Sequence, residues 1–154
     1  MLAITRLLSA LALVVALVAL AASPAAAQEG TGAKCTLFTA LKPGNEVPPS
    51  TSLAFGAAAV HIDGAKLSFA VAIANLSRET FIAGHIHKAP AGVNGGVVVP
   101  LFSSTGVSPR VFFQADSVEI DPALGTDICD NPDQYYVNYH TTQRPSGTTR
   151  GQLG

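Results

Sequence analysis

The sequence predicts an all-β fold, an antiparallel Greek-key sandwich or closed barrel, for most of the chain. From Lys34 onward, short apolar runs are separated by Gly, Pro, Asn and Asp, and no stretch shows a sustained 3.6-residue period with helix caps. In addition, the large residues Leu67, Phe69, Val71 and Ile73 alternate with Ser and Ala. This period-two pattern, with one large face and one small face, is typical of a strand in a packed sandwich or barrel.

The beginning of the chain has a different composition. Residues Leu7–Ala22 are almost entirely apolar, follow Arg6 and precede an Ala-x-Ala step at Ala25–Ala27. A basic start, an apolar stretch and a small-residue cleavage site together predict a secretory signal peptide over residues 1–27. An uncleaved membrane anchor is the alternative. We therefore expect a secreted protein, extracellular or periplasmic, with one domain over residues 28–154 and no membrane contact after cleavage.

Seven strands and a short eighth are predicted along this domain. In order, they cover residues 34–41, 52–62, 66–75, 80–87, 97–102, 110–120, 134–140 and 150–153. Asp63-Gly64 predicts a tight hairpin between the second and third strands, because Gly readily adopts positive φ. Gly56, followed by three alanines, predicts a bulge or a close sheet contact in the second strand.

The two cysteines, Cys35 and Cys129, are both in the expected mature domain. In an oxidising compartment such a pair predicts a disulfide, which would close a loop of 94 residues (129 − 35). Buried free thiols or thiolate metal ligands are the alternatives. We favour the disulfide because neither cysteine belongs to a CxxC pair.

The charge balance and the absent motifs exclude several functions. The chain has 9 Lys and Arg and 10 Asp and Glu, without a basic cluster, so we expect no nucleic-acid partner. There is no Gly-x-Ser-x-Gly, P-loop or Gly-x-Gly-x-x-Gly motif. Serine hydrolase, NTPase and dinucleotide-binding functions therefore have no support, and no organic cofactor is expected.

Histidines form the most informative pattern. His85 and His87 are two residues apart, so on a strand both side chains lie on the same face, about 6.6 Å apart along the chain. His140, at the end of a predicted strand, is the expected third ligand, and His61 is a candidate fourth ligand. Imidazole ligands without thiolate suit copper or zinc. The alternative is that these histidines are surface or hydrogen-bonded residues that bind nothing.

Three other groups have weaker patterns. Glu46 is either a general base beside the histidines or a residue that orders the Pro-rich loop around it. Arg150 is either an anion guide near the metal or a hydrogen-bonding clamp on the last strand. Tyr135, Tyr136 and Tyr139 either form a binding surface or pack into the sheet.

Several segments resemble the CHRD domain, the module named after chordin. The matching segments are FTALKPGNEVPP at 38–49, GHIH at 84–87, AGVNGGVVV at 91–99, YVNYHT at 136–141 and GTTRGQL at 147–153. Thr148-Thr149 departs from the family's usual ending, and Tyr139 stands where Val is usual. Neither departure affects His85, His87 or His140.

The resemblance implies an immunoglobulin-like β-barrel with limited similarity to copper/zinc superoxide dismutases. CHRD domains occur in chordin, an extracellular antagonist of bone morphogenetic proteins, and in many secreted microbial proteins. This chain looks like the microbial single-domain members, so growth-factor antagonism is not carried over. By analogy with the dismutases, His85, His87 and His140 would be copper ligands and Arg150 the anion guide. Without a second, zinc-holding subsite, any dismutase would be copper-only.

Three functions follow, in order of preference. The first is a secreted domain that binds copper or zinc through His85, His87 and His140. The second is an extracellular interaction module that presents loops 88–96 and 141–149 to a protein or matrix partner. The third is a dismutase-type oxidoreductase, which ranks last because a shared fold is a weak argument for activity.

Overall fold

The computed structural model describes residues 32–154, so the predicted signal peptide at 1–27 lies outside the described residues. Within this part of the chain, eight strands and three helical segments follow one another. They are β1 (Lys34–Leu41), η1 (Pro43–Asn45), β2 (Ala54–Asp63), β3 (Lys66–Asn75), β4 (Phe81–Lys88), β5 (Gly96–Val107), β6 (Val111–Glu119), α2 (Pro122–Asp130), η2 (Pro132–Gln134), β7 (Tyr135–Thr141) and β8 (Thr149–Gln152). Each predicted strand is present, and β5 continues five residues beyond its predicted end at residue 102.

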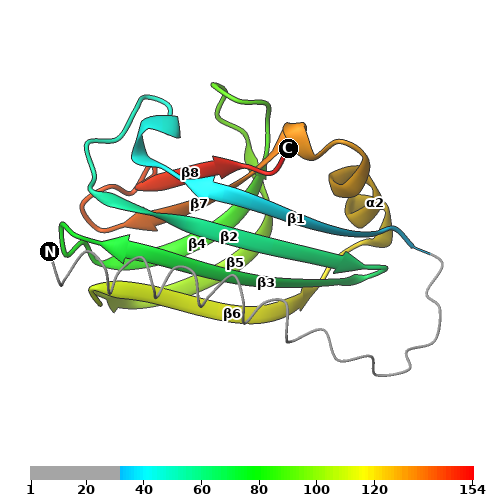
Figure 1. The fold of residues 1–154 in the computed structure, drawn as a ribbon, viewed down its shortest axis with the longest axis horizontal. Coiled ribbons are helices and arrows are strands. Elements are labelled where there is room, and N and C mark those ends of the chain that lie inside the picture. Colours follow the sequence, from blue (N-terminus) through cyan, green and yellow to red (C-terminus); the bar gives the residue numbers. More distant parts are fainter. Residues whose placement is uncertain (1–31) are drawn as a thin grey trace, which may run out of the picture.

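The strands form two antiparallel four-stranded sheets that pack face to face (Figure 1). The strand orders are β1-β2-β3-β6 in the first sheet and β5-β4-β7-β8 in the second. An isolated bridge between Lys42 and Arg150 connects the β1 and β8 edges, but the two sheets remain separate. The predicted all-β fold is therefore confirmed as an open sandwich, and the closed-barrel alternative does not apply.

The core lies between the two sheets and follows the period-two pattern. In β3, Leu67, Phe69, Val71 and Ile73 are all buried in it, as the alternation predicts. In the second sheet, the core residues include Ile86, Val137 and Tyr139. Since neighbouring residues of a strand point to opposite faces, the residues between these core positions lie on the outer face of the second sheet.

Glycine permits two local features of the first sheet. Gly64, in the two-residue turn between β2 and β3, has φ +61°, a conformation that favours Gly. At Gly56, a Cβ atom would lie 1.9 Å from the carbonyl oxygen of Ala72 on the neighbouring strand. Only a glycine fits this close approach, which the sequence predicted.

The helix α2 contradicts the expectation that the chain contains no capped helix. Asp121 precedes it and its side chain accepts a hydrogen bond from the backbone nitrogen of Ala123 at 2.8 Å, while Pro122 occupies the first helical turn. These start signals are visible in the sequence. The nine-residue helix is too short for a convincing apolar period.

The disulfide between Cys35 and Cys129 is present, which confirms that prediction. It connects the beginning of β1 to α2, so the helix is held against one end of the first sheet. Between residues 32 and 154, no helix is both long enough and apolar enough to cross a membrane.

Candidate metal site

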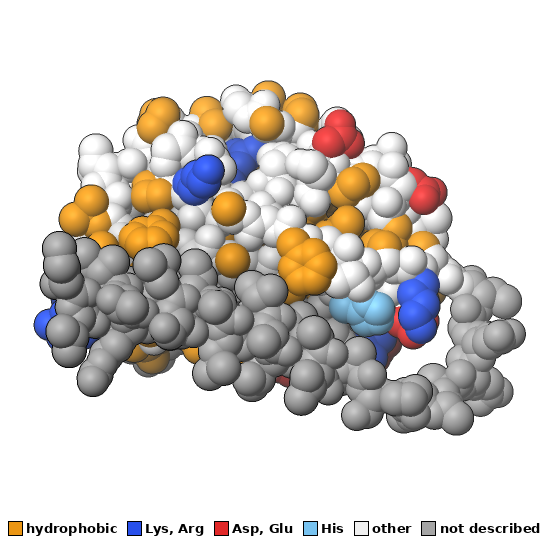
Figure 2. Space-filling model, in the orientation of Figure 1, with side chains coloured by type: hydrophobic (Ala, Val, Ile, Leu, Met, Phe, Trp, Pro, Cys, Tyr) orange, Lys and Arg blue, Asp and Glu red, His pale blue; other side chains and the backbone are white. Residues whose placement is uncertain are grey.

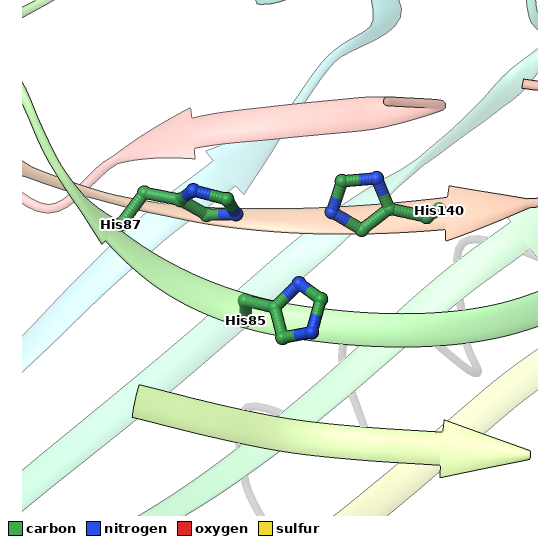
Figure 3. Close-up of side chains that lie close together, drawn as sticks. All are labelled: His85, His87 and His140. Atoms are coloured by element: carbon green, nitrogen blue, oxygen red, sulfur yellow. The ribbon is translucent and has the colours of Figure 1, made fainter. Parts of the chain in front are cut away.

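The candidate site lies on the outer face of the second sheet, where β4 and β7 are antiparallel neighbours. In the register of this pair, His87 lies opposite Tyr136, His85 opposite Asn138, and Ala83 opposite His140. Ile86 points to the core, so the histidines on either side of it point outward. Figure 3 shows the three imidazole rings facing a common space above the two strands.

The three rings are close enough to share one ion. One nitrogen atom of each ring lies within 4.8 Å of the corresponding nitrogen of the other two. The distances between ring centroids are 5.0 Å from His85 to His140, 5.5 Å from His85 to His87 and 5.9 Å from His87 to His140. A tetrahedral ion with bonds of about 2 Å needs nitrogens about 3.3 Å apart. The nitrogens are therefore within about 1.5 Å of the separation that such an ion requires.

Backbone carbonyls orient two of the rings. His87 Nδ1 lies 3.0 Å from the carbonyl oxygen of Gly95, and His140 Nδ1 lies 3.0 Å from that of Pro145. When Nδ1 donates to a carbonyl, the neutral ring keeps its lone pair on Nε2, as metal-binding histidines commonly do. Both Nε2 atoms are buried and have no hydrogen-bond partner among residues 32–154, and the same is true of His85 Nδ1. The three unpartnered nitrogens suit a cation.

Burial also keeps the imidazoles neutral. Desolvation, followed by the charges of His140 and His87, lowers the pKa of His85 to about 4. Desolvation likewise lowers the pKa of His87 and His140 below the ordinary value of 6.5. Neutral imidazole is the form that binds a metal, so the ligands are available at neutral pH without losing a proton first.

His87 is also held by stacking, because its ring packs on Tyr136, which in turn packs on Arg150. The His87 and Tyr136 rings lie 4.8 Å apart and are almost parallel, with an interplanar angle of 4°. The Arg150 guanidinium lies 3.3 Å from the centre of the Tyr136 ring, on which it forms a cation–π contact. The Tyr136 hydroxyl accepts a hydrogen bond of 3.1 Å from the backbone nitrogen of Gly95, the residue whose carbonyl faces His87.

Arg150 is placed as the clamp that the sequence suggested. Its side chain is only 1% exposed, and it donates to Asn94 Oδ1 at 3.4 Å and to the Pro90 carbonyl at 3.2 Å. These bonds hold the loop after β4 against β8. Its other predicted role is that of an anion guide. That role would require an anion to reach a guanidinium group that is almost fully buried, so the burial of Arg150 does not favour it.

Glu46 follows η1 and contacts β7 through Asn138, the residue opposite His85 in the strand register. One carboxylate oxygen of Glu46 accepts a hydrogen bond of 3.3 Å from Asn138 Nδ2, and the other has no partner in the described part of the chain. Burial raises the pKa of Glu46 to about 7, although the charge of Arg150 and the Asn138 hydrogen bond oppose the rise. With Arg150 and Gln152, Glu46 lines a pocket of ≈ 470 Å³.

The remaining candidates are divided between the two sheets. His61 is in β2 of the first sheet and its Nδ1 lies 2.8 Å from the hydroxyl oxygen of Thr36, so it does not join the cluster. Of the three tyrosines, Tyr135 and Tyr139 belong to the core, and only Tyr136 faces the site. Asn138 was missed, although it alternates with Tyr136 and His140 along one strand.

These features define a class: a β-sandwich protein with a three-histidine cluster on the outer face of one sheet. The chain belongs to the CHRD family, because the family model for the CHRD domain matches residues 37–153. The match spans every described strand except the first three residues of β1 and confirms the resemblance. No curated protein and no solved structure matches the chain in the corresponding comparisons.

Proposed function

We propose that the protein binds one transition metal ion, copper or zinc, through His85, His87 and His140. The observation that carries the proposal is the convergence of three imidazoles, each of which has one buried nitrogen without a hydrogen-bond partner among the described residues. Leaving a buried polar atom unpaired costs about 1–3 kcal/mol, and a bound cation would offset that cost at all three atoms.

The ligand types limit the choice of metal. Three neutral imidazoles without a carboxylate or thiolate suit copper and zinc, and they are poor ligands for calcium or magnesium. Three protein ligands leave a fourth position of a tetrahedral ion open, where a bound metal can polarise a small ligand. Binding is preferred to dismutase catalysis, since the buried Arg150 is poorly placed to guide an anion.

We also propose that the protein is exported. The basic start, apolar stretch and Ala-x-Ala step support a signal peptide over residues 1–27. The Cys35–Cys129 disulfide supports an oxidising compartment, because disulfides are rare in reducing ones. An extracellular or periplasmic site of action is compatible with membership of the CHRD family.

Isothermal titration with Zn(II) and with Cu(II) tests the metal proposal. We expect the unchanged protein to bind at least one of them with a Kd below about 10 μM, or about −7 kcal/mol. The double variant His85→Ala/His87→Ala should weaken binding at least about 100-fold and should lose the metal-dependent rise in Tm. Binding weaker than 10 μM in the unchanged protein, or unaltered binding in the double variant, would contradict the proposal.

His61→Ala is the matched control, because it removes an imidazole from the opposite sheet. It should leave the metal affinity unchanged. A loss of affinity in this variant equal to that of the double variant would mean that the measured binding is not at the candidate site. If the protein is instead an interaction module that uses loops 88–96 and 141–149 without metal, neither the unchanged protein nor the double variant should bind Zn(II) or Cu(II) in this titration.

A further inference from the structure

The outer face of the first sheet carries several large apolar side chains that are exposed to solvent. Phe38 is 61% exposed, Phe113 is 55% exposed, and Phe55 and Val111 are 41% and 47% exposed. Large exposed apolar side chains gathered on one surface commonly mark an interaction site. Figure 2 shows hydrophobic side chains on the surface viewed from the side of β1, β2 and β3.

Alanines occupy the positions between the phenylalanines on the same face. The strand register places one row of residues across all four strands: Phe38, Ala59, Ala70 and Ala115. The next row contains Ala40, Ala57, Ala72 and Phe113, and a third contains Phe55, Ala74 and Val111. An open hollow of ≈ 350 Å³ lies beside Phe38, along Ala40 and Ala57. The face therefore combines large side chains with alanine positions above which a large side chain of a binding partner would fit.

One end of this face carries charges of alternating sign. The register aligns Lys34, Asp63, Lys66 and Glu119 in a single row across β1, β2, β3 and β6. Lys34 Nζ already pairs with Asp63 within the chain at 2.7 Å. From β1 to β6, the charges are positive, negative, positive and negative. If a second row of this kind faced the first in reverse order, each positive charge would therefore lie opposite a negative charge.

We propose that this face binds a second copy of the same chain, in a face-to-face dimer. The two-fold axis would run parallel to the strands, between β2 and β3. Each β1 then lies over β6 of the second copy, and each β2 lies over its β3. The strands of the two sheets stay nearly parallel, as in aligned sheet packing.

This symmetry pairs each charge of that row with an opposite charge. Lys34 meets Glu119 of the second copy, and Asp63 meets Lys66, because the axis reverses the strand order and keeps each row facing itself. An axis perpendicular to the strands would instead lay the charged row over the row of Phe55 and Val111. That arrangement would desolvate charges against apolar side chains, which is costly.

The same symmetry also pairs large side chains with small ones. Phe113 lies over Ala40 of the second copy, beside the hollow, and Phe38 lies over Ala115. In the third row, Phe55 lies over Ala74. Because each phenylalanine meets an alanine, the two faces can approach closely without a clash between rings, as well-packed interfaces require.

The size of the face sets the expected affinity. Four strands about 4.8 Å apart, with about nine residues each at about 3.3 Å per residue, cover roughly 500 Å² per copy. A total of roughly 1,000 Å² is at the lower end for specific interfaces, where association is weak. We therefore expect a dimer with a Kd of roughly 1–100 μM.

Sedimentation equilibrium tests the dimer at protein concentrations between 1 and about 500 μM. The protein is purified in the form that its host produces, after any removal of the predicted signal peptide. A chelator is present throughout, so a metal bridge between histidine sites cannot cause association. Phe113→Ser should weaken the dimer at least roughly 30-fold, since an aromatic contact is lost twice per dimer. Leu76→Ser, which removes a 55%-exposed side chain from the turn after β3, should leave the Kd unchanged.

Charge reversal tests the register. Lys34→Glu should weaken the dimer roughly three- to tenfold, and Lys34→Glu/Glu119→Lys should restore it. Within one chain the double change places a carboxylate beside Asp63 and an ammonium beside Lys66, both unfavourable. Recovery of the dimer can therefore come only from contacts between copies.

Three results would overturn the proposal. The first is a protein that stays monomeric at 500 μM, and the second is a dimer that Phe113→Ser leaves intact. The third is a double charge variant that dimerises no better than Lys34→Glu. A monomeric protein that sediments with phosphatidylcholine vesicles would assign the face to a membrane instead.

Discussion

At the residue scale, the histidine cluster depends on groups that are not ligands. Gly95 is the clearest case, because its carbonyl accepts from His87 and its nitrogen donates to Tyr136. A Cβ atom at Gly95 would lie 2.0 Å from the carbonyl oxygen of Lys88. No side chain fits there unless the backbone moves, so the orientation of His87 depends on this glycine.

We therefore expect Gly95→Ala to weaken metal binding although it removes no ligand. The displaced carbonyl would no longer orient His87, and such losses typically cost 10- to 100-fold in affinity. Gly96→Ala is the matched control, since a Cβ atom there would have no neighbour within 4 Å among the residues that the structure describes. Titration of both variants with Zn(II) measures the difference. Equal affinities would show that Gly95 does not position His87.

Metal affinity should depend on pH in the range set by the buried imidazoles. Protons compete with the metal for each ring only near or below its pKa, and burial lowers the pKa of His85 to about 4 and lowers those of His87 and His140. We expect the affinity to change less between pH 7.5 and 6.5 than for free imidazole and to fall steeply at lower pH. An affinity that stays constant down to pH 4 would contradict histidine ligation.

Glu46 should destabilise the protein at alkaline pH. Its pKa is raised from 4.5 to about 7, so the folded state binds a proton that the unfolded state has lost between these values. Its contribution to stability is present below pH 4.5 and is lost as the pH rises through 7. Glu46→Gln should therefore gain stability relative to the unchanged protein between pH 5 and pH 8, by up to about 3 kcal/mol. Urea denaturation at pH 5 and at pH 8 measures the free energy of unfolding of both proteins. The same difference in free energy at both pH values would be inconsistent with a buried carboxyl group whose pKa is raised.

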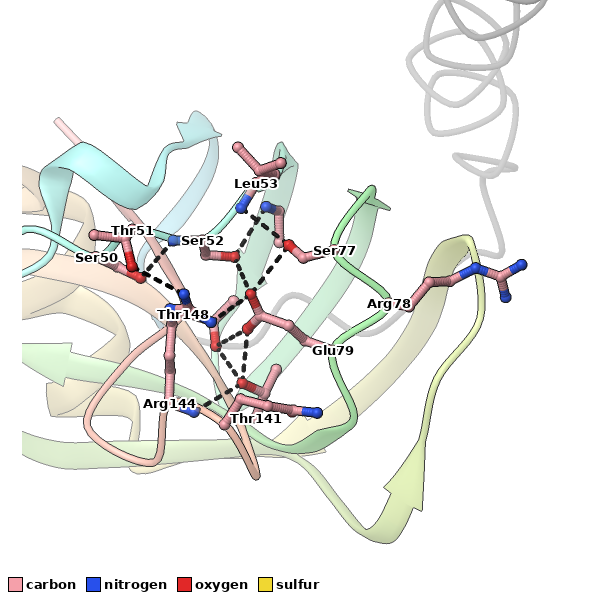
Figure 4. Close-up of polar contacts among 12 residues, drawn as sticks. Ser50, Thr51, Ser52, Leu53, Ser77, Arg78, Glu79, Thr141, Arg144 and Thr148 are labelled. Atoms are coloured by element: carbon pink, nitrogen blue, oxygen red, sulfur yellow. Dashed lines mark hydrogen bonds and ion pairs between the residues drawn. The ribbon is translucent and has the colours of Figure 1, made fainter.

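At the scale of elements, one buried glutamate joins the ends of several strands. Glu79, between β3 and β4, forms an ion pair with Arg144 at 2.7 Å and accepts from Ser52 at 2.7 Å and from Thr141 at 2.8 Å (Figure 4). Thr141 ends β7, and Ser52 precedes β2. The cluster thus fixes the first sheet to the strand that carries His140.

Glu79 should have the opposite pH dependence to Glu46. Burial alone would raise the pKa of Glu79, but the hydrogen bonds from Ser52 and Thr141 and the charge of Arg144 outweigh it and lower the pKa below 4.5. The stability it contributes is present above pH 4.5 and is lost as the pH falls through the lowered pKa.

Glu79→Gln should therefore destabilise the protein by about 2 kcal/mol at pH 7, and the loss should shrink as the pH falls below 4.5. Chemical denaturation at pH 7 and pH 4 measures both values. Asp130→Ala removes an exposed carboxylate with no hydrogen bond among the described side chains, and it should change stability by no more than about 0.5 kcal/mol. A loss that stays the same at both pH values would mean that the Glu79 charge is not responsible.

At the scale of the whole molecule, the disulfide ties a short helix to a sheet edge across a separation of 94 residues. Closing a loop of that length stabilises the folded state by about 4–5 kcal/mol in the chain-entropy treatment. The double variant Cys35→Ser/Cys129→Ser should lose most of that free energy of unfolding, as measured by guanidinium denaturation. An unchanged denaturation midpoint would mean that the disulfide does not constrain the unfolded chain.

The strands could be predicted because their signal is local. Period-two alternation in β3, turn residues at Asp63-Gly64 and the spacing of His85 and His87 are properties of short segments, and each has the expected place in the structure. The helix α2 was missed for the converse reason. Nine residues are marginal as an isolated helix, and Ile128 and the disulfide at Cys129 supply the stability from outside the segment.

The adjacency of His140 to His85 and His87 was decided by the tertiary structure. The strands that carry them are separated by about fifty residues and pair only because both sheets bury their apolar faces together. The outward direction of the cluster, the carbonyls of Gly95 and Pro145 and the placement of His61 on the opposite sheet follow from that packing. The sequence encodes the candidate ligand types and their spacing along one strand. The position of the third candidate ligand depends on long-range strand pairing, which no local pattern specifies.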